Sequence, residues 1–150
     1  GWALAHFANY AFDFSETHNA GLIKEIKDQP ISINNRQLGK IVKVKFTKSP
    51  NEQSNMIVEY PVKNGVIGGS SVWKTYEIFD ILTKFKLINS KGAWSYLSDE
   101  SQFDEMAKAG ANPPEGRKWN GGKAFLAWLE GDSKAQEYFG GIIQKIIPKS

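Results

Sequence analysis

The sequence predicts a mixed α/β protein, of the α+β kind, in which antiparallel strands come first and a small helical domain with a β-hairpin follows. Residues 41–48 and 56–62 alternate apolar and polar side chains with the period of two that is typical of half-buried strands. Residues 72–85 instead repeat apolar side chains at steps of three and four, which predicts an amphipathic helix. The chain therefore combines both kinds of element.

Composition restricts the classes of protein to consider. The 150 residues are 41% hydrophobic, with five Trp and nine Phe, which is sufficient for a buried core. The absence of cysteine excludes disulfides and thiolate metal sites and is compatible with a reducing cytosol. Because the sequence has neither an apolar run of about eighteen residues nor the pattern of a signal peptide, we expect no membrane span and a cytoplasmic location. The chain begins without methionine on an apolar segment, so we expect a fragment of a longer protein.

The net charge of +3 is unevenly distributed along the chain. Residues 31–65 contain six lysines and arginines against two glutamates, and residues 117–150 contain six against three acidic residues. Between them, residues 99–116 contain five acidic residues against one lysine. Two basic zones separated by an acidic one are expected of a nucleic-acid footprint, but solvated faces produce the same pattern.

The first third of the chain is expected to form strands. Residues 3–14 are almost continuously apolar, as in a strand buried on both faces, although a helix is possible in the first half. Residues 15–38 are polar and rich in turn residues, which favours a connection with short strand pieces. In residues 41–48 and 56–62, the side chains expected to point inward are Val42, Val44, Phe46, Val58, Tyr60 and Val62. The two segments are expected to pair as an antiparallel hairpin.

The helix that follows should pack through a stripe of five apolar residues, namely Val72, Tyr76, Phe79, Leu82 and Phe85. Ser70 or Ser71 is expected to cap its start. Residues 89–92 then have turn chemistry, and the aromatic run 93–97 predicts a short strand. We expect Trp94 and Tyr96 to pack on the helix stripe.

The last third of the chain is expected to form helices. Ser101 should cap a helix over residues 102–109 that Gly110 ends, and the carboxylates at its start are better explained by the helix dipole than by catalysis. Residues 116–124 do not form a Walker A loop, since no Gly-Lys pair there has both the required spacing and a following Ser or Thr. Closing helices are expected over residues 123–129 and 135–147, the second capped by Ser133.

Three motifs resemble RecA-type recombinases. After the helix and its Lys-Gly turn, residues 92–96 read GAWSY, which is similar to the entry into the family's C-terminal domain. Residues 44–48 resemble a strand end of the ATPase core, and residues 121–129 resemble the turn before the family's closing helices. The departures from the family pattern resemble divergent phage recombinases of the UvsX kind. The resemblance implies that residues 1–69 are the terminal antiparallel strands of a RecA-like ATPase core and residues 70–150 the small DNA-binding C-terminal domain, with an insertion between residues 97 and 117.

The resemblance also implies candidate nucleotide-site residues. Lys48 takes the place of a lysine that reaches the triphosphate of the neighbouring subunit, and Lys45 precedes it on the same strand end. The second such lysine is absent, and without the resemblance Lys48 would be interpreted as a solvated strand end. Asn64 stands where many members place an adenine-stacking tyrosine. His6 is either an interface residue near the neighbour's nucleotide or a hydrogen-bonded histidine at a strand start, and its distance in sequence from His18 does not favour a metal site.

The basic C-terminal zone and the resemblance together suggest phosphate contacts to duplex DNA by Lys91, Arg117, Lys118 and Lys123. The implied function is that of the C-terminal portion of an ATP-dependent DNA strand-exchange recombinase, acting in homologous recombination and repair. The implied partners are double-stranded DNA and other protomers in a filament, or an N-terminal half. The parent would be a DNA-dependent ATPase, but this chain lacks Walker A and Walker B, so ATP and Mg would act only through the N-terminal half. A free-standing DNA-binding module and an inactive split-gene fragment remain alternatives.

Overall fold

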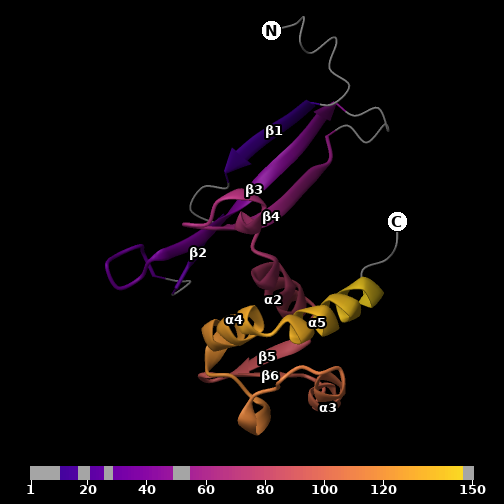
Figure 1. Ribbon diagram of the computed structural model, residues 1–150. Coiled ribbons are helices and arrows are strands. Elements are labelled where there is room, and N and C mark those ends of the chain that lie inside the picture. The colour runs from indigo at the N-terminus through magenta and orange to yellow at the C-terminus, as the bar shows by residue number, and fades with distance from the viewer. Residues whose placement is uncertain (1–10, 17–20, 26–28, 49–54, 147–150) are drawn as a thin grey trace, which may run out of the picture. The chain divides into compact units, whose positions relative to one another are not determined.

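The computed structural model describes residues 11–16, 21–25, 29–48 and 55–146, without the side chains of Glu16 and Lys48. Within these residues the fold is mixed α+β, with antiparallel sheets and four α-helices (Figure 1). The chain divides into two compact units, Gly1–Trp73 and Lys74–Ser150, which are called unit 1 and unit 2. The division therefore lies between residues 73 and 74, whereas the boundary expected from the sequence lies between residues 69 and 70.

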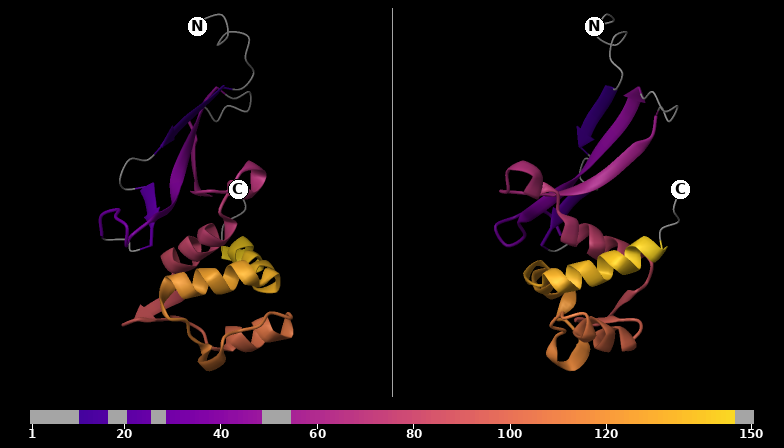
Figure 2. Two further views of the ribbon diagram at one scale, coloured as in Figure 1. Left: turned by 60° about the vertical axis from the view of Figure 1, so that its left-hand side comes forward. Right: turned by 45° about the vertical axis from the view of Figure 1, so that its right-hand side comes forward.

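Unit 1 is built on an antiparallel sheet around one long strand. Its elements are β1 (Ala11–Glu16), β2 (Leu22–Lys24), β3 (Gln37–Lys48), β4 (Ile57–Lys63) and the 3-10 helix η2 (Gly68–Ser71). Strand β3 pairs with β1 and β2 along one edge and with β4 along the other, as Figure 2 shows. The predicted pairing of residues 41–48 with 56–62 is thus confirmed, and an ion pair of 2.7 Å joins Lys43 to Glu59 across it. Strand β2 and the Ser32–Asn35 bridge are the expected short strand pieces.

One face of this sheet carries apolar side chains that remain exposed. The pairing places Phe12 opposite Phe46, and both Phe14 and Val58 opposite Val44, so these five residues share a face, which we call the aromatic sheet face. Phe12, Phe14 and Val58 are 48%, 65% and 41% exposed. The expectation that the first strand is buried on both faces is therefore wrong for its described part, and residues 3–10 lie outside the described residues. The phenyl rings are exposed because β3 pairs with β1 along its edge, whereas the rings project from the face of the sheet.

The segment before the long helix differs from the sequence-based expectation. Ser70 and Ser71 do not cap that helix, because their hydroxyls donate to the carbonyls of Ile67 and Gly68 within η2. Val72 instead forms a bridge with Val62. The helix α2 then begins only after Trp73, whose N–H donates to the carbonyl of Pro61 over 2.8 Å. Pairing with β4 has thus removed Val72 from the predicted helix stripe.

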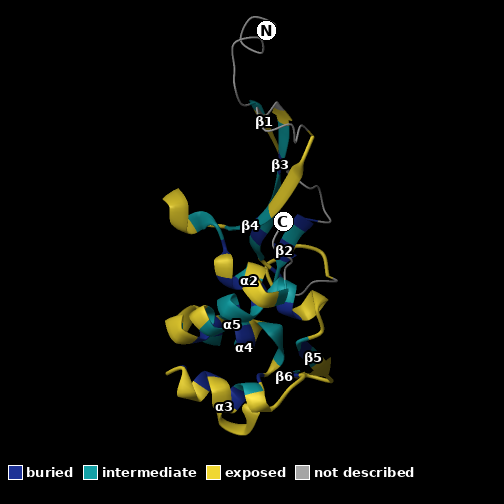
Figure 3. Ribbon diagram, turned by 90° about the vertical axis from the view of Figure 1, so that its right-hand side faces the viewer, coloured by how far each residue is buried: buried dark blue, intermediate teal, exposed yellow. Residues whose placement is uncertain are grey.

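Unit 2 encloses its own core between helices and a hairpin. Its elements are α2 (Lys74–Lys84), β5 (Ile88–Lys91), β6 (Trp94–Leu97), α3 (Ser101–Lys108), η3 (Glu115–Arg117), α4 (Gly121–Gly131) and α5 (Ser133–Ile146). Buried segments alternate with exposed ones along α3, α4 and α5 (Figure 3), as the amphipathic patterns predict. The largest buried apolar residues of the core are Leu82, Leu97, Phe103, Met106, Trp119, Phe125, Leu129 and Phe139.

The hairpin packs on this core through the face opposite to the expected one. Ser95 and Leu97 are buried, whereas Trp94 is 44% exposed. Because side chains alternate along a strand, burial of Leu97 directs Trp94 outward. The expectation that Trp94 and Tyr96 pack on the helix stripe is therefore wrong, because both lie on the face of β6 opposite to the buried Ser95 and Leu97. The tryptophan buried in the core of unit 2 is Trp119, whose ring stacks on Phe103 with centroids 5.5 Å apart.

Aspartates, rather than the expected serines, fix the starts of two helices. The Asp99 carboxylate accepts hydrogen bonds from the N–H and hydroxyl of Ser101 (2.9 and 2.7 Å) at the start of α3. Asp132 Oδ1 accepts from the N–H groups of Lys134 and Ala135 (both 3.0 Å) at the start of α5, so Ser133 is not the cap. Gly110, at φ 86°, follows the end of α3 as predicted.

Candidate nucleic-acid interface

The outer face of the β5–β6 hairpin carries both basic and aromatic side chains. Antiparallel pairing places Lys91 directly opposite Trp94, and Asn89 opposite Tyr96. Directly opposed residues lie on the same face of a sheet. Since Ser95 of β6 is buried on the inner face, Trp94 and Tyr96 project from the outer face together with Lys91.

The segment before α4 adds a third strand-like row to the hairpin. Ser95 and Trp119 exchange two backbone hydrogen bonds, each of 2.8 Å. Lys118 has extended backbone angles (φ −155°, ψ 158°), so its side chain points opposite to the buried ring of Trp119. Its Nζ lies 4.4 Å from the ring centroid of Trp94, in a cation–π contact. Lys118 thereby joins the outer face.

We call Lys91, Trp94, Tyr96 and Lys118 the hairpin face. Lys91, Trp94 and Lys118 are exposed, and Tyr96 is partly buried. Within the described residues, neither lysine forms an ion pair, so both ammonium charges of this face are available to an anion. The arrangement provides two positive charges on either side of an exposed aromatic ring.

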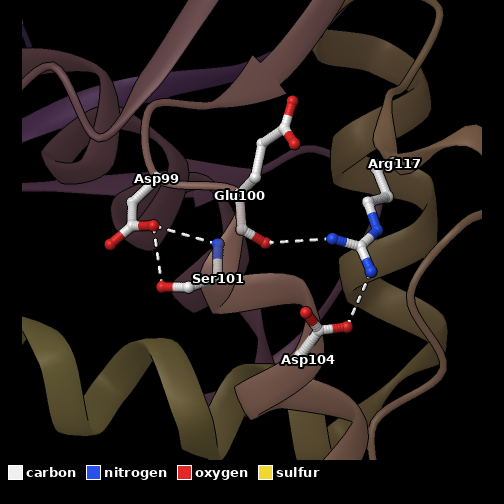
Figure 4. A network of polar contacts seen from close by, with 5 residues as sticks. All are labelled: Asp99, Glu100, Ser101, Asp104 and Arg117. Carbon is white, nitrogen blue, oxygen red and sulfur yellow. Dashed lines mark hydrogen bonds and ion pairs between the residues drawn. The ribbon is translucent and has the colours of Figure 1, made fainter.

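Arg117, a third predicted DNA contact, is engaged elsewhere. Its guanidinium bonds the Asp104 carboxylate over 2.7 Å and the carbonyl of Glu100 over 3.5 Å, as Figure 4 shows. It also lies over the ring of Phe103, 5.9 Å from the centroid. Both partners of the ion pair are about half exposed, so the pair itself contributes roughly 0–1 kcal/mol. Arg117 thus joins η3 to α3 and is not grouped with the hairpin face.

Lys123, the fourth candidate, is exposed in the first turn of α4. The preceding Gly121, at φ 77°, comes close to the hairpin turn, because a Cβ there would lie 3.8 Å from the carbonyl oxygen of Ala93. The start of α4 therefore lies beside the turn that joins β5 to β6. Lys123 lies two residues after Gly121 in this helix turn.

The predicted nucleotide-site residues of unit 1 lie toward opposite ends of β3. Lys45 is opposite Asp13 and Ile57, and the backbone of Lys48 is opposite Ala11. Asn64 instead closes the far end, where its N–H donates to the carbonyl of Leu38 over 2.9 Å and its side-chain amide donates to that of Gln37 over 3.3 Å.

Seven residues of strand separate Leu38 from Lys45, or roughly 23 Å at the usual rise. Asn64 and Lys45 therefore do not meet in one site within this chain. His6 and the side chain of Lys48 lie outside the described residues.

Sequence reasoning placed Trp94 in the core and so missed it as a surface residue. The signal that could have found it is the parity of the strand: Leu97 lies three positions later, on the opposite face. Tyr96 lies two residues after Trp94, so the same alternation places its side chain on the outer face as well.

No protein-family model matches this chain, and no curated protein is similar to it. The recombinase resemblance therefore depends on the motifs of the sequence alone. In the part of the chain that the structure describes, no helix is long and apolar enough to cross a membrane. The same described residues contain no group of three or more His, Cys, Asp or Glu side chains that could hold a metal ion.

Proposed function

We propose that this chain is the C-terminal portion of an ATP-dependent DNA strand-exchange recombinase of the RecA/UvsX kind, which acts in homologous recombination and repair. In this proposal unit 2 binds duplex DNA, and unit 1 forms the interface with an ATP-binding half or with neighbouring protomers. The single observation that carries the DNA-binding part is the grouping of Lys91 and Lys118 on one exposed face. ATP and Mg act only through the ATP-binding half.

Phosphate recognition explains how such a face binds DNA. Each lysine that neutralises a phosphate releases condensed counterions, so the affinity is independent of sequence and falls with salt. Lys91, Lys118 and Lys123 together supply at most three such contacts, and Arg117 contributes only if it leaves Asp104. We therefore expect weak binding that shows little sequence preference.

The aromatic sheet face supports the assembly part of the proposal. Phe14 and Val58 are 65% and 41% exposed on the same face. Exposed apolar patches of this kind mark protein–protein interaction sites. An ATP-binding half that packs on this face would bury these side chains.

Salt-dependent fluorescence anisotropy tests the DNA-binding part. With a labelled duplex, the log–log slope of affinity against salt should decrease in magnitude by about 0.9 for each lysine removed, or about 1.8 in the double variant Lys91→Ala, Lys118→Ala. Lys108→Ala is the matched control, since it removes one exposed lysine of unit 2 at the end of α3. An unchanged slope in the double variant, or no binding by the wild type at high micromolar concentration, would contradict the proposal.

A second candidate function is a free-standing DNA-binding module. The core of unit 2 favours it, because Phe125, Leu129 and Phe139 are fully buried by residues of that unit. Such a module would bind DNA through the same hairpin face but would restore no ATPase activity when joined to an ATP-binding half. Restoration of activity therefore distinguishes the two candidates.

A further inference from the structure

Duplex binding through phosphates requires only the lysines of the hairpin face and gives no role to the tryptophan between them. Trp94 is 44% exposed, whereas Trp119 is buried in the core of unit 2. Tyr96 lies on the same face, two residues later along β6. The two rings therefore form an aromatic surface beside two cationic side chains.

Proteins that bind single-stranded nucleic acids combine these same two features. Positive side chains follow the phosphates, and aromatic rings stack on the bases with little regard to sequence. In a duplex the faces of the bases are stacked on one another, so an indole at the surface has nothing to stack on. The indole of Trp94 can therefore stack on bases that are not paired.

We propose that the hairpin face binds an unpaired segment of a DNA strand, with one base stacked on the indole of Trp94 and the flanking phosphates on Lys91 and Lys118. This inference rests on the proposed function, since it specifies which form of DNA the same face prefers. Lys118 holds its ammonium over the indole when no DNA is bound. Its flexible stem lets the ammonium move to a phosphate when a base takes its place on the ring.

Three labelled ligands separate stacking from phosphate binding in the full chain. They are an oligothymidine strand of about 20 nucleotides, an abasic strand with the same number of phosphates, and a duplex of the same length. The wild type should bind oligothymidine more tightly than the abasic strand. Trp94→Ala should weaken oligothymidine binding roughly 5- to 150-fold and change binding of the other two ligands less than about twofold.

Two variants control for indirect effects. Trp94→Phe retains an aromatic ring, so it should restore most of the oligothymidine affinity that Trp94→Ala loses. Phe85→Ala removes an exposed ring elsewhere in unit 2 and should leave all three affinities unchanged. Circular dichroism of each variant verifies that the fold is kept.

The outcomes separate this inference from the proposed duplex binding. Equal affinity of the wild type for oligothymidine and the abasic strand overturns the stacking role, even if Trp94→Ala does not fold. An equal loss of affinity for all three ligands in Trp94→Ala also overturns the stacking role. In both cases the proposed salt-sensitive binding of duplex DNA would remain valid. Binding of oligothymidine without binding of the duplex would support the inference and overturn the proposed duplex contact, and binding of no ligand would overturn both.

Discussion

The phenylalanines of the two units differ in environment: Phe103, Phe125 and Phe139 of unit 2 are buried, with Phe85 (52% exposed) as an exception, whereas Phe12 and Phe14 of unit 1 are 48% and 65% exposed. In unit 2 Phe125 contacts Phe139, and Phe103 stacks on Trp119, inside a core enclosed by helices and a hairpin. In unit 1 the rings lie on one face of a sheet. The comparison shows that unit 2 encloses its large apolar side chains in a core of its own, whereas unit 1 leaves several of them exposed on one face of its sheet.

The largest effect that tests this comparison is expected in the core of unit 2. Trp119→Ala should reduce the free energy of unfolding of unit 2 by about 3–5 kcal/mol, because a large buried side chain leaves a cavity. Trp119→Phe should cost clearly less, since the buried indole N–H donates to no described group. Urea unfolding followed by circular dichroism measures both. A cost for Trp94→Ala as large as that for Trp119→Ala would show that the two tryptophans have been assigned to the wrong sides of the hairpin.

A smaller effect is expected where α4 meets α5. Besides capping α5, Asp132 accepts a hydrogen bond from the N–H of Asn112 over 2.7 Å, so Asp132→Ala should destabilise unit 2 by about 1 kcal/mol. Burial raises the pKa of the Asp132 carboxyl, but the three backbone N–H donors outweigh it and hold this pKa below its usual value. A depressed folded-state pKa contributes stability above the unfolded-state pKa, and this contribution is lost as pH falls through the folded-state value.

The difference between wild type and Asp132→Ala in urea unfolding should therefore shrink below about pH 4. Asp132→Asn keeps an acceptor for the cap without the charge, and its stability should lack this contribution to the pH dependence. An Asp132→Ala difference of the same size at neutral and acidic pH would mean that the carboxylate charge adds nothing at this helix start.

The smallest effect on stability is expected on the aromatic sheet face of unit 1. Phe14→Ser should change the free energy of unfolding by no more than about 0.5 kcal/mol, because the side chain is 65% exposed. The same change should weaken association with an ATP-binding half in sedimentation experiments. Lys43→Ala, on the opposite face of the sheet, is the control for association. A large loss of stability from Phe14→Ser would show that this face is already covered in the isolated chain.

The sequence predicted elements whose pattern has a clear period. The alternation in β3 and β4 and the apolar stripe of α2 each predict which residues point inward. The structure agrees for Val44 and Leu82 but not for Val58 and Phe85, which are 41% and 52% exposed. The helix caps were less predictable, because Asp99 and Ser101 both offer an oxygen close to the same helix start. Only the folded geometry selects between them.

The candidate site was predicted only in part, because the grouping of its residues depends on contacts between distant parts of the sequence. Lys91 and Lys118 were predicted as DNA contacts from the basic C-terminal zone and the resemblance together. Their grouping around Trp94 depends on the pairing of Ser95 with Trp119, which lie far apart in the sequence. Trp119 stands in a segment of glycines and basic residues without any period, so nothing local marked it as a core residue. The engagement of Arg117 by Asp104 likewise depends on how α3 folds back on η3.

The most direct test of the recombinase proposal is DNA-stimulated ATP hydrolysis after the chain is combined with the ATP-binding half of a RecA/UvsX-type recombinase. We expect the wild-type chain to support hydrolysis and Lys48→Ala to reduce it strongly, because loss of a charge partner at a partly desolvated triphosphate costs about 2 kcal/mol or more. Lys48→Ala should leave the fold and the duplex affinity of the isolated chain nearly unchanged, and Lys43→Ala should affect hydrolysis less. Equal hydrolysis with wild type and Lys48→Ala would contradict the role of Lys48, and no hydrolysis with any ATP-binding half would contradict the recombinase assignment itself.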